Sequence, residues 1–324
     1  MARLSYAEAA CTALERAMAA DAAVVVVGED VGRGGVFGQY RGLLQKFGAA
    51  RVIDAPISES AIMGAAVGMA LAGLRPVVEM RVVDFALCAI DEIVNQAAKA
   101  RYMLGGQGRV PLVARMPIGL WAGSAAQHSQ SLEAWFAHVP GLVVVTPATA
   151  QDNCSLLAAA IASGDPVVYM EHKELWGMQG EVDPGAGAEL GKARVLRRGG
   201  DATLVAWSRT VHTALDAAAR AADRGLAVEV IDLRTLWPWD RDTVLASAAR
   251  TGRLLVAQEA VRVAGFGAEI AAEAAEALGI RVARVGAPRI PVGYSKPLED
   301  ESRVGAPAIV AAIEALCGER RAAS

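Results

Sequence analysis

The sequence has few cysteines, few aromatic residues and no strong charge of either sign. Four cysteines in 324 residues stand far apart, at none of the spacings typical of zinc or redox motifs. A net charge of −3 with scattered basic residues provides no electrostatic footprint for nucleic acid or an anionic membrane. The apolar, uncharged run 60–74 is shorter than the ~20 residues of a membrane-spanning helix. We therefore expect a cytoplasmic protein that binds neither nucleic acid nor membrane.

The sequence is rich in small aliphatic residues, being 54% hydrophobic but only 5% aromatic. Short β-branched runs such as 24–27 alternate with helical patterns, an order typical of parallel sheets covered on both faces. The alternation stops in a Pro- and Gly-rich segment and then resumes. We predict an α/β fold with two three-layer domains and mainly parallel sheets. Their expected bounds are 1–182 and 192–324, joined by a linker at 183–191.

In the stretch Asp54–Gly64, Glu59 is a lone acid at the start of a very apolar helix. No charged residue follows Glu59 until Arg75, which predicts a helix buried on all sides. Ser58 or Ser60 is suited to cap it. At such a position Glu59 can simply favour the helix dipole, for under ~1 kcal/mol. If buried, it could instead share a proton with a ligand nitrogen. The pattern alone leaves both roles open.

The same helix carries glycines at 64 and 68. This spacing lets another backbone approach closely and indicates a helix–helix contact that a second subunit could supply.

Only four histidines are present, and no two share the i, i+4 spacing of a helical metal site. His128 stands in a polar loop between a predicted strand and helix, where ligands commonly bind on parallel sheets. Its imidazole could transfer protons near neutral pH, or it could be an exposed residue at a polar helix start. For His138 and His212 a structural role is the simpler interpretation. His172 could line a ligand site or end a solvated strand.

Several longer runs carry a resemblance to a known family. They include Gly28–Val31, Asp54–Ser60, Gly73–Pro76, Ala125–Ser131, Asp165–Val168 and Pro297–Asp300. In this order, and over nearly the whole chain, they resemble the β subunit of the thiamine-diphosphate-dependent E1 component of 2-oxoacid dehydrogenase complexes. Pyruvate, branched-chain and acetoin dehydrogenases belong to that family.

The resemblance implies a pyrimidine-binding domain followed by a transketolase C-terminal-like domain. It implies oxidative decarboxylation of a 2-oxoacid, pyruvate being the expected one, with acyl transfer to the lipoyl group of an acyltransferase (E2) core. In the family a separate α subunit holds the diphosphate and Mg²⁺ through a Gly-Asp-Gly motif, which this sequence lacks. We therefore expect an α2β2 heterotetramer.

The resemblance also assigns residues to the site. Glu59 matches the glutamate that hydrogen-bonds the cofactor aminopyrimidine, with Ile57 beside it, and Phe85 matches the ring that packs on the pyrimidine. Cys88 stands where related enzymes often have Gln. His128 matches the active-site histidine credited with proton transfer and reductive acylation.

A potassium ion held by main-chain groups is a further implication of the resemblance, and its residues here are Leu112, Ala160, Ile161 and Asp165. Ser163 replaces the usual Asp. The alternatives are the β subunit of an acetoin or branched-chain 2-oxoacid dehydrogenase, or a non-catalytic pairing subunit. The segment 171–175 resembles acetoin enzymes, whereas 294–300 resembles pyruvate enzymes.

Overall fold

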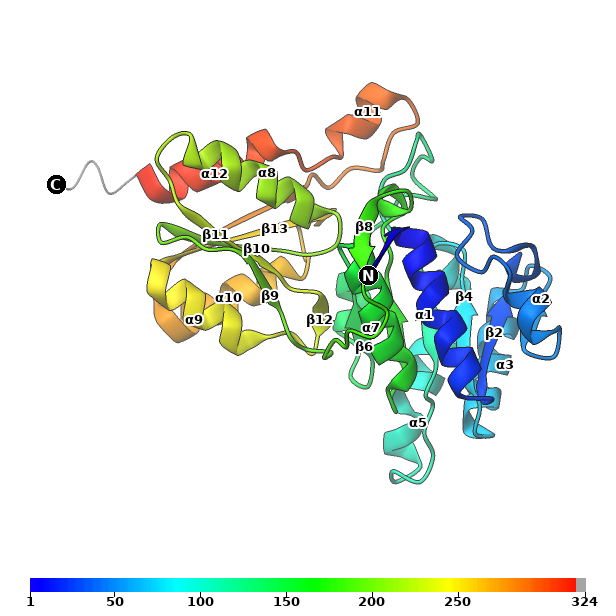
Figure 1. Ribbon diagram of the computed structural model, residues 1–324. Helices are drawn as coiled ribbons and strands as arrows, with labels where there is room; N and C mark the ends of the chain where they lie inside the picture. The colour runs from blue at the N-terminus through cyan, green and yellow to red at the C-terminus, as the bar shows by residue number, and fades with distance from the viewer. Residues whose placement is uncertain (319–324) are drawn as a thin grey trace. The chain divides into compact units, whose positions relative to one another are not determined.

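The computed structural model describes residues 1–318 and divides into two compact units, both visible in Figure 1. Unit 1 comprises Met1–Ile118 and Trp135–Leu190, and unit 2 comprises Gly119–Ala134 and the chain from Gly191 onward. The sequence prediction included the segment 119–134 in the first domain, whereas in the structure this segment packs within unit 2. Within the described residues, no helix is long and apolar enough to cross a membrane.

Unit 1 is built on a parallel sheet in which its own strands follow the order β6-β7-β5-β4-β2-β3. The strand bounds are β2 Val24–Gly28, β3 Val52–Asp54, β4 Arg75–Glu79, β5 Val113–Arg115, β6 Val143–Val145 and β7 Val167–Tyr169. All five residues of β2 are buried, as expected for a central strand covered on both faces. A separate antiparallel pair joins β1 (Ala2–Ser5) to β8 (Gln179–Val182).

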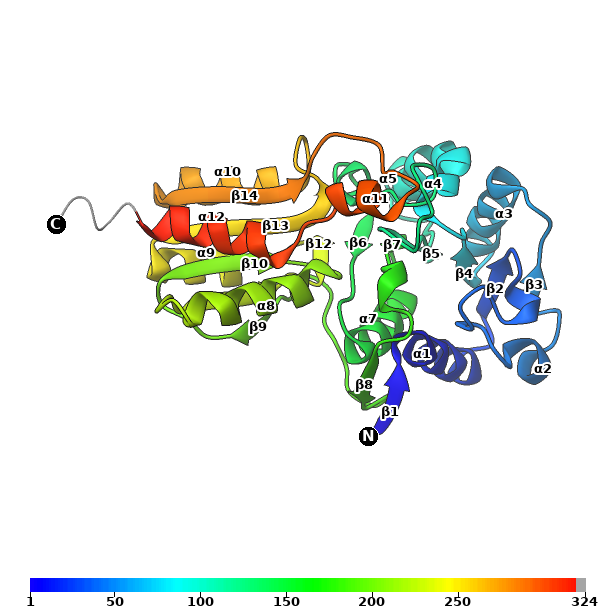
Figure 2. The same cartoon turned by 90° about the horizontal axis from the view of Figure 1, so that it is seen from above.

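Helices cover both faces of this sheet. Figure 2 shows α1 and α7 on one side and α3, α4 and α5 on the other. The bounds are α1 Tyr6–Ala20, α2 Leu43–Phe47, α3 Glu59–Leu71, α4 Val83–Ala86, α5 Ala98–Met103, α6 Glu133–Ala137 and α7 Ala150–Ala162. Between α4 and α5 the chain forms a 3₁₀ turn, Leu87–Ala89, and a π-helical stretch, Glu92–Ala97. Shorter 3₁₀ turns occur at Val31–Arg33 and Lys173–Leu175.

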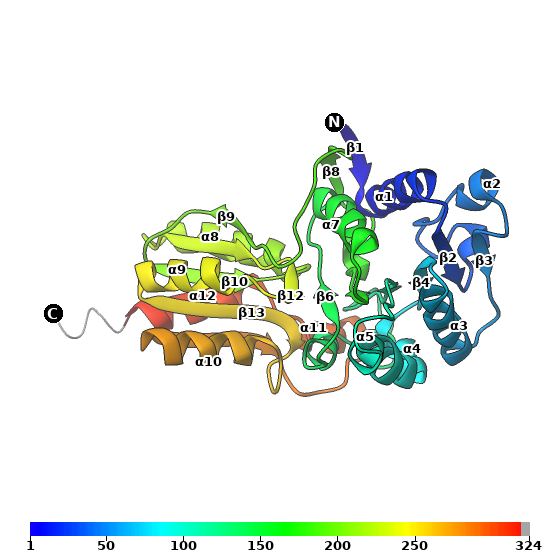
Figure 3. The ribbon, with the colours of Figure 1, turned by 90° about the horizontal axis from the view of Figure 1, so that it is seen from below.

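Unit 2 has a five-stranded sheet in the order β14-β13-β10-β11-β9, parallel except for β9. The five strands are β9 Arg194–Arg197, β10 Ala202–Ala206, β11 Val228–Asp232, β13 Arg253–Val261 and β14 Arg281–Ala287. A further short strand, β12 (Thr235–Trp237), is not part of this sheet. Helices α8 (Thr210–Ala222) and α12 (Ala306–Gly318) cover one face, and α9 (Arg241–Thr251) and α10 (Gly267–Leu278) cover the other (Figure 3). The short α11 is Lys296–Glu301.

Candidate active site

The first turn of α3 presents Glu59. Ser58 is the N-cap residue, but its hydroxyl makes no cap bond and instead donates to the Pro56 carbonyl at 2.9 Å. The Ser60 hydroxyl donates to the carbonyl of Cys88. The predicted serine cap is therefore absent at Ser58, and Ser60 ties the helix start to the neighbouring 3₁₀ turn. Glu59 itself is half-buried.

A cavity of about 460 Å³ lies beside this turn, and Asp54, Ile57 and Glu29 are among the residues that line it. Burial raises the pKa of Glu29, and the negative charge of Glu59 raises it further. Two other lining residues, Asp30 and Arg81, form an ion pair. Both hold positive φ values, 57° and 61°, a conformation that costs energy for residues other than glycine. Strained backbone at a charged cavity is typical of a functional site.

The predicted cofactor-binding residues gather at the same end of α3 within unit 1. Ile57 is 79% exposed just before the helix. Cys88 is exposed and its carbonyl is held by Ser60. Phe85 is half-buried in α4, three residues before Cys88.

The helix α3 is not buried on all sides, contrary to the sequence prediction. One face packs inward through Ile62, Met63, Ala66, Val67 and Ala70. The opposite face is exposed and apolar, and it contains Ala61, Gly64, Ala65, Gly68 and Leu71. A Cβ placed at Gly68 would meet no atom within 4 Å. The exposed glycine face can therefore accept a close-packed second chain.

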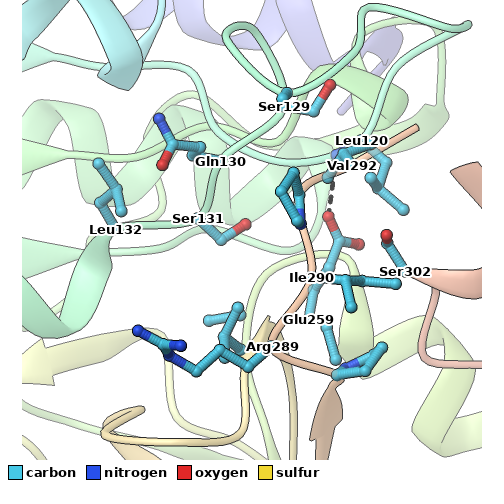
Figure 4. A pocket seen from close by; sticks show the side chains of 16 residues that line it. Leu120, Ser129, Gln130, Ser131, Leu132, Glu259, Arg289, Ile290, Val292 and Ser302 are labelled. Atoms are coloured by element: carbon cyan, nitrogen blue, oxygen red, sulfur yellow. Dashed lines mark hydrogen bonds between the residues drawn. The ribbon is translucent and has the colours of Figure 1, made fainter. Parts of the chain in front are cut away.

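The loop that carries His128 belongs to unit 2 and is held there by three hydrogen bonds. Leu120 N donates to Glu259 Oε1 at 3.0 Å (Figure 4). Gly123 N donates to Glu299 Oε1 at 2.9 Å. At the loop's far end Trp207 Nε1 donates to Glu133 Oε1 at 3.0 Å.

Between these anchors His128 is exposed, as expected for a group that exchanges protons with a ligand. Ala122 and Ala125 hold positive φ values of 47° and 62°. The sequence did not indicate that Glu259, Glu299 and Trp207 hold this loop, because each lies far along the chain from its partner.

The four residues predicted to bind potassium already have other partners in unit 1. The Ile161 carbonyl accepts from Arg75 Nη1 at 3.0 Å, so a cation bound there would lie beside a fixed positive charge. Asp165 forms an ion pair with Arg101. The carbonyls of Ala160 and Leu112 accept backbone N–H groups at 3.2 and 2.9 Å. In residues 1–318 no cluster of three His, Cys, Asp or Glu side chains could hold a metal ion either.

The segment that resembles acetoin enzymes forms part of the core of unit 1. Glu171 is fully buried and pairs with the buried Arg115 at 2.6 Å. His172 is also buried, and its Nδ1 accepts from Glu174 N. These side chains are therefore held inside unit 1 by hydrogen bonds and an ion pair.

Comparisons with known proteins agree with this architecture. The family model for the transketolase pyrimidine binding domain matches residues 2–178, and that for the transketolase C-terminal domain matches 191–309. In overall structure the chain is similar to a split-gene transketolase described as an inactive β4 tetramer. The TM-score is 0.80 at 24% identity, over 97% of this chain and 98% of that one. The predicted two-domain α/β fold with mainly parallel sheets is confirmed.

Curated relatives match nearly the full chain. It is 43% identical to the acetoin:2,6-dichlorophenolindophenol oxidoreductase subunit beta of Cupriavidus necator, over 92% of this chain and 93% of the relative. It is 41% identical to the pyruvate dehydrogenase E1 component subunit beta of Rhizobium meliloti, over 98% of this chain and 70% of the relative. It is 39% identical to the 2-oxoisovalerate dehydrogenase subunit beta of Bacillus subtilis, over 98% of this chain and 99% of the relative.

Proposed function

This chain belongs to the family of transketolase-like β subunits of 2-oxoacid and acetoin dehydrogenases, and we propose that it is the cytoplasmic β subunit of a 2-oxoacid dehydrogenase E1. It shares thiamine diphosphate with an α subunit in an α2β2 assembly that docks on a lipoyl acyltransferase core. Pyruvate is the proposed substrate. Residues 1–182 act as the pyrimidine-binding domain, although their segment 119–134 packs within unit 2. Residues 192–324 act as the transketolase C-terminal-like domain, with 183–191 as linker.

The observation that carries this proposal is the position of Glu59. It is a half-buried acid on the first turn of a helix whose neighbouring face is apolar, exposed and marked by Gly64 and Gly68. A chain packed on that face would enclose the acid and remove it from water. The chain has no Gly-Asp-Gly motif, so we assign the diphosphate and its Mg²⁺ to the partner.

When bound, thiamine diphosphate supplies the electron sink for cleavage of the bond next to a 2-oxo group. Glu59 would hold the proton shared with N1′ of the aminopyrimidine, and burial by the partner would favour this protonated form. Ile57 and Phe85 offer apolar surface to the ring, and Cys88 lies beside them. The exposed imidazole of His128 would move protons for the reacting oxygen and the lipoyl sulfur near neutral pH.

The second candidate is an acetoin dehydrogenase β subunit, because the Cupriavidus necator relative of that name is 43% identical. The segment 294–300, which is exposed except at Glu299, favours the pyruvate enzymes instead. The alternatives differ in the substrate consumed. Co-expression with an α subunit that carries Gly-Asp-Gly allows pyruvate, 2-oxoisovalerate and acetoin to be compared by reduction of 2,6-dichlorophenolindophenol.

We expect pyruvate to give the highest kcat/KM. In the same assay Glu59→Gln should lower kcat by about 100-fold or more, a typical effect of losing a proton-transfer group. Glu276→Gln, which changes an exposed glutamate of α10, is the matched control. Faster turnover of acetoin would establish the second candidate, and full activity of Glu59→Gln would remove Glu59 from the mechanism.

A further inference from the structure

Unit 2 contains a cavity of about 440 Å³ beside the His128 loop (Figure 4). It is formed by that loop, the end of β13 and the irregular chain that follows β14. Its volume lies in the range of small-molecule sites, roughly 300–1,000 Å³. The apolar part of its wall includes Leu120, Ile290 and Val292. The polar part consists of three serines, one glutamine, one acid and one arginine: Ser129, Ser131, Ser302, Gln130, Glu259 and Arg289.

Two of the serine hydroxyls make this cavity unusual. Ser129 is 3% exposed and Ser302 is 4% exposed. Neither hydroxyl oxygen has a hydrogen-bond partner. Buried polar groups are nearly always satisfied, because an unmade hydrogen bond costs the full desolvation of the group. Two such hydroxyls lining one cavity are available to bond a ligand.

The charges of the wall indicate what kind of ligand this is. Glu259 is half-buried, and its Oε1 already accepts from Leu120 N, which fixes the carboxylate at the cavity. Arg289 is exposed and lines the same cavity. One acid and one base make the charged lining neutral. An organic anion would be attracted by Arg289 but repelled by Glu259, whereas a zwitterion satisfies both.

We propose that this cavity binds a small zwitterion, an α-amino acid with an apolar side chain. The ammonium group pairs with Glu259 and the carboxylate pairs with Arg289. The hydroxyls of Ser129 and Ser302 complete the hydrogen bonds to the ligand. Its side chain lies against Leu120, Ile290 and Val292. The proposal is separate from the dehydrogenase function, since it concerns binding within unit 2 alone.

Calorimetric titration of the full chain tests the ligand class, with neither thiamine diphosphate nor 2-oxoacid present. L-Leucine is the probe. L-2-Hydroxy-4-methylpentanoate lacks its ammonium group, and 3-methylbutylamine lacks its carboxylate. We expect saturable binding of leucine and at least about 10-fold weaker binding of each truncated ligand, the usual loss of one charge-assisted hydrogen bond. Equal binding of leucine and the hydroxy acid, or no saturable leucine binding, would overturn the proposal.

Variants test the location. Arg289→Gln should weaken leucine binding about 10-fold or more, and Ser302→Ala about 2- to 10-fold. Arg262→Gln, at an exposed arginine outside the cavity wall, should leave binding unchanged. Ser302→Ala should melt at no lower temperature than the parent, because it removes an unpaired buried hydroxyl. Unchanged affinity in Arg289→Gln would contradict the site. Failure of these binding tests leaves the dehydrogenase assay unaffected, so the two hypotheses fail independently.

Discussion

Glu79 is a buried carboxylate at the end of β4 whose environment makes the stability of unit 1 depend on pH. Burial raises its pKa above the ordinary 4.5, and the nearby charge of Arg115 only partly opposes this. Tyr40 Oη donates to its Oε2 at 2.7 Å. A carboxyl with a raised folded pKa stabilises the fold below its unfolded pKa, and that contribution is lost as pH rises through the folded value.

We therefore predict that Glu79→Gln changes the pH profile in one direction. The free energy of unfolding of the parent, minus that of the variant, should fall as pH rises from about 4.5 towards 8, because only the parent must bury a charge. Urea denaturation at a series of pH values measures the difference. Glu276→Gln serves as the exposed control. A difference that stays constant or grows with pH would show that Glu79 is not the group responsible.

At the residue scale the sequence indicated candidate site residues such as Glu59, but not the residues that hold the His128 loop in place. Glu59 was recognisable because it is a single acid next to a long uncharged run. The role of Glu299 as an anchor of the loop was not recognisable, because its hydrogen bond from Gly123 N joins residues 176 positions apart. The segment 171–175 resembles acetoin enzymes, but the sequence did not reveal that the side chain of Glu171 is buried in an ion pair with Arg115.

At the element scale, α3 shows what a pattern of apolar residues can and cannot predict. The run of small and aliphatic residues correctly predicts a helix from Glu59. It does not reveal that only one face is covered by unit 1, since a face reserved for another chain has the same composition as a core face. Leu71, at the end of the exposed face, is 49% exposed.

The exposed face of α3 leads to a prediction about assembly with the α subunit. Gly68→Leu should fold at least as stably as the parent, because the site has open space and glycine in a helix interior costs roughly 1 kcal/mol relative to alanine. The added side chain should nevertheless block close packing of a second helix and lower the mass of the complex with the α subunit. Light scattering after gel filtration measures this. Ala219→Leu, on the exposed side of α8, is the control, and an unchanged complex would rule out this face as the interface.

At the scale of the whole molecule, alternating strands and helices were sufficient to predict two α/β units. They could not predict that 119–134 packs with the later unit. Three anchors from distant parts of the chain help to hold this segment there: Glu259 in β13, Glu299 in α11 and Trp207 after β10. Each is an isolated polar contact, and no hydrophobic period or motif signals such a contact in a sequence.

The anchor at Glu299 provides a test of how the His128 loop is held. Glu299 is 2% exposed, and its Oε1 accepts the Gly123 N–H at 2.9 Å. Glu299→Ala removes the acceptor, and an unsatisfied buried N–H costs roughly 1–3 kcal/mol. The loop can recover hydration of Gly123 by opening, so its amides should exchange with deuterium about 5- to 150-fold faster than in the parent, as that free energy implies. Glu299→Gln keeps an acceptor oxygen and should restore most of the protection. Exchange in α8, which lacks these contacts, should be the same in all three proteins.

If Glu299→Ala left the loop as protected as the parent, the other two anchors would be sufficient to hold His128. Loss of protection throughout unit 2 would instead assign Glu299 to the stability of the whole unit.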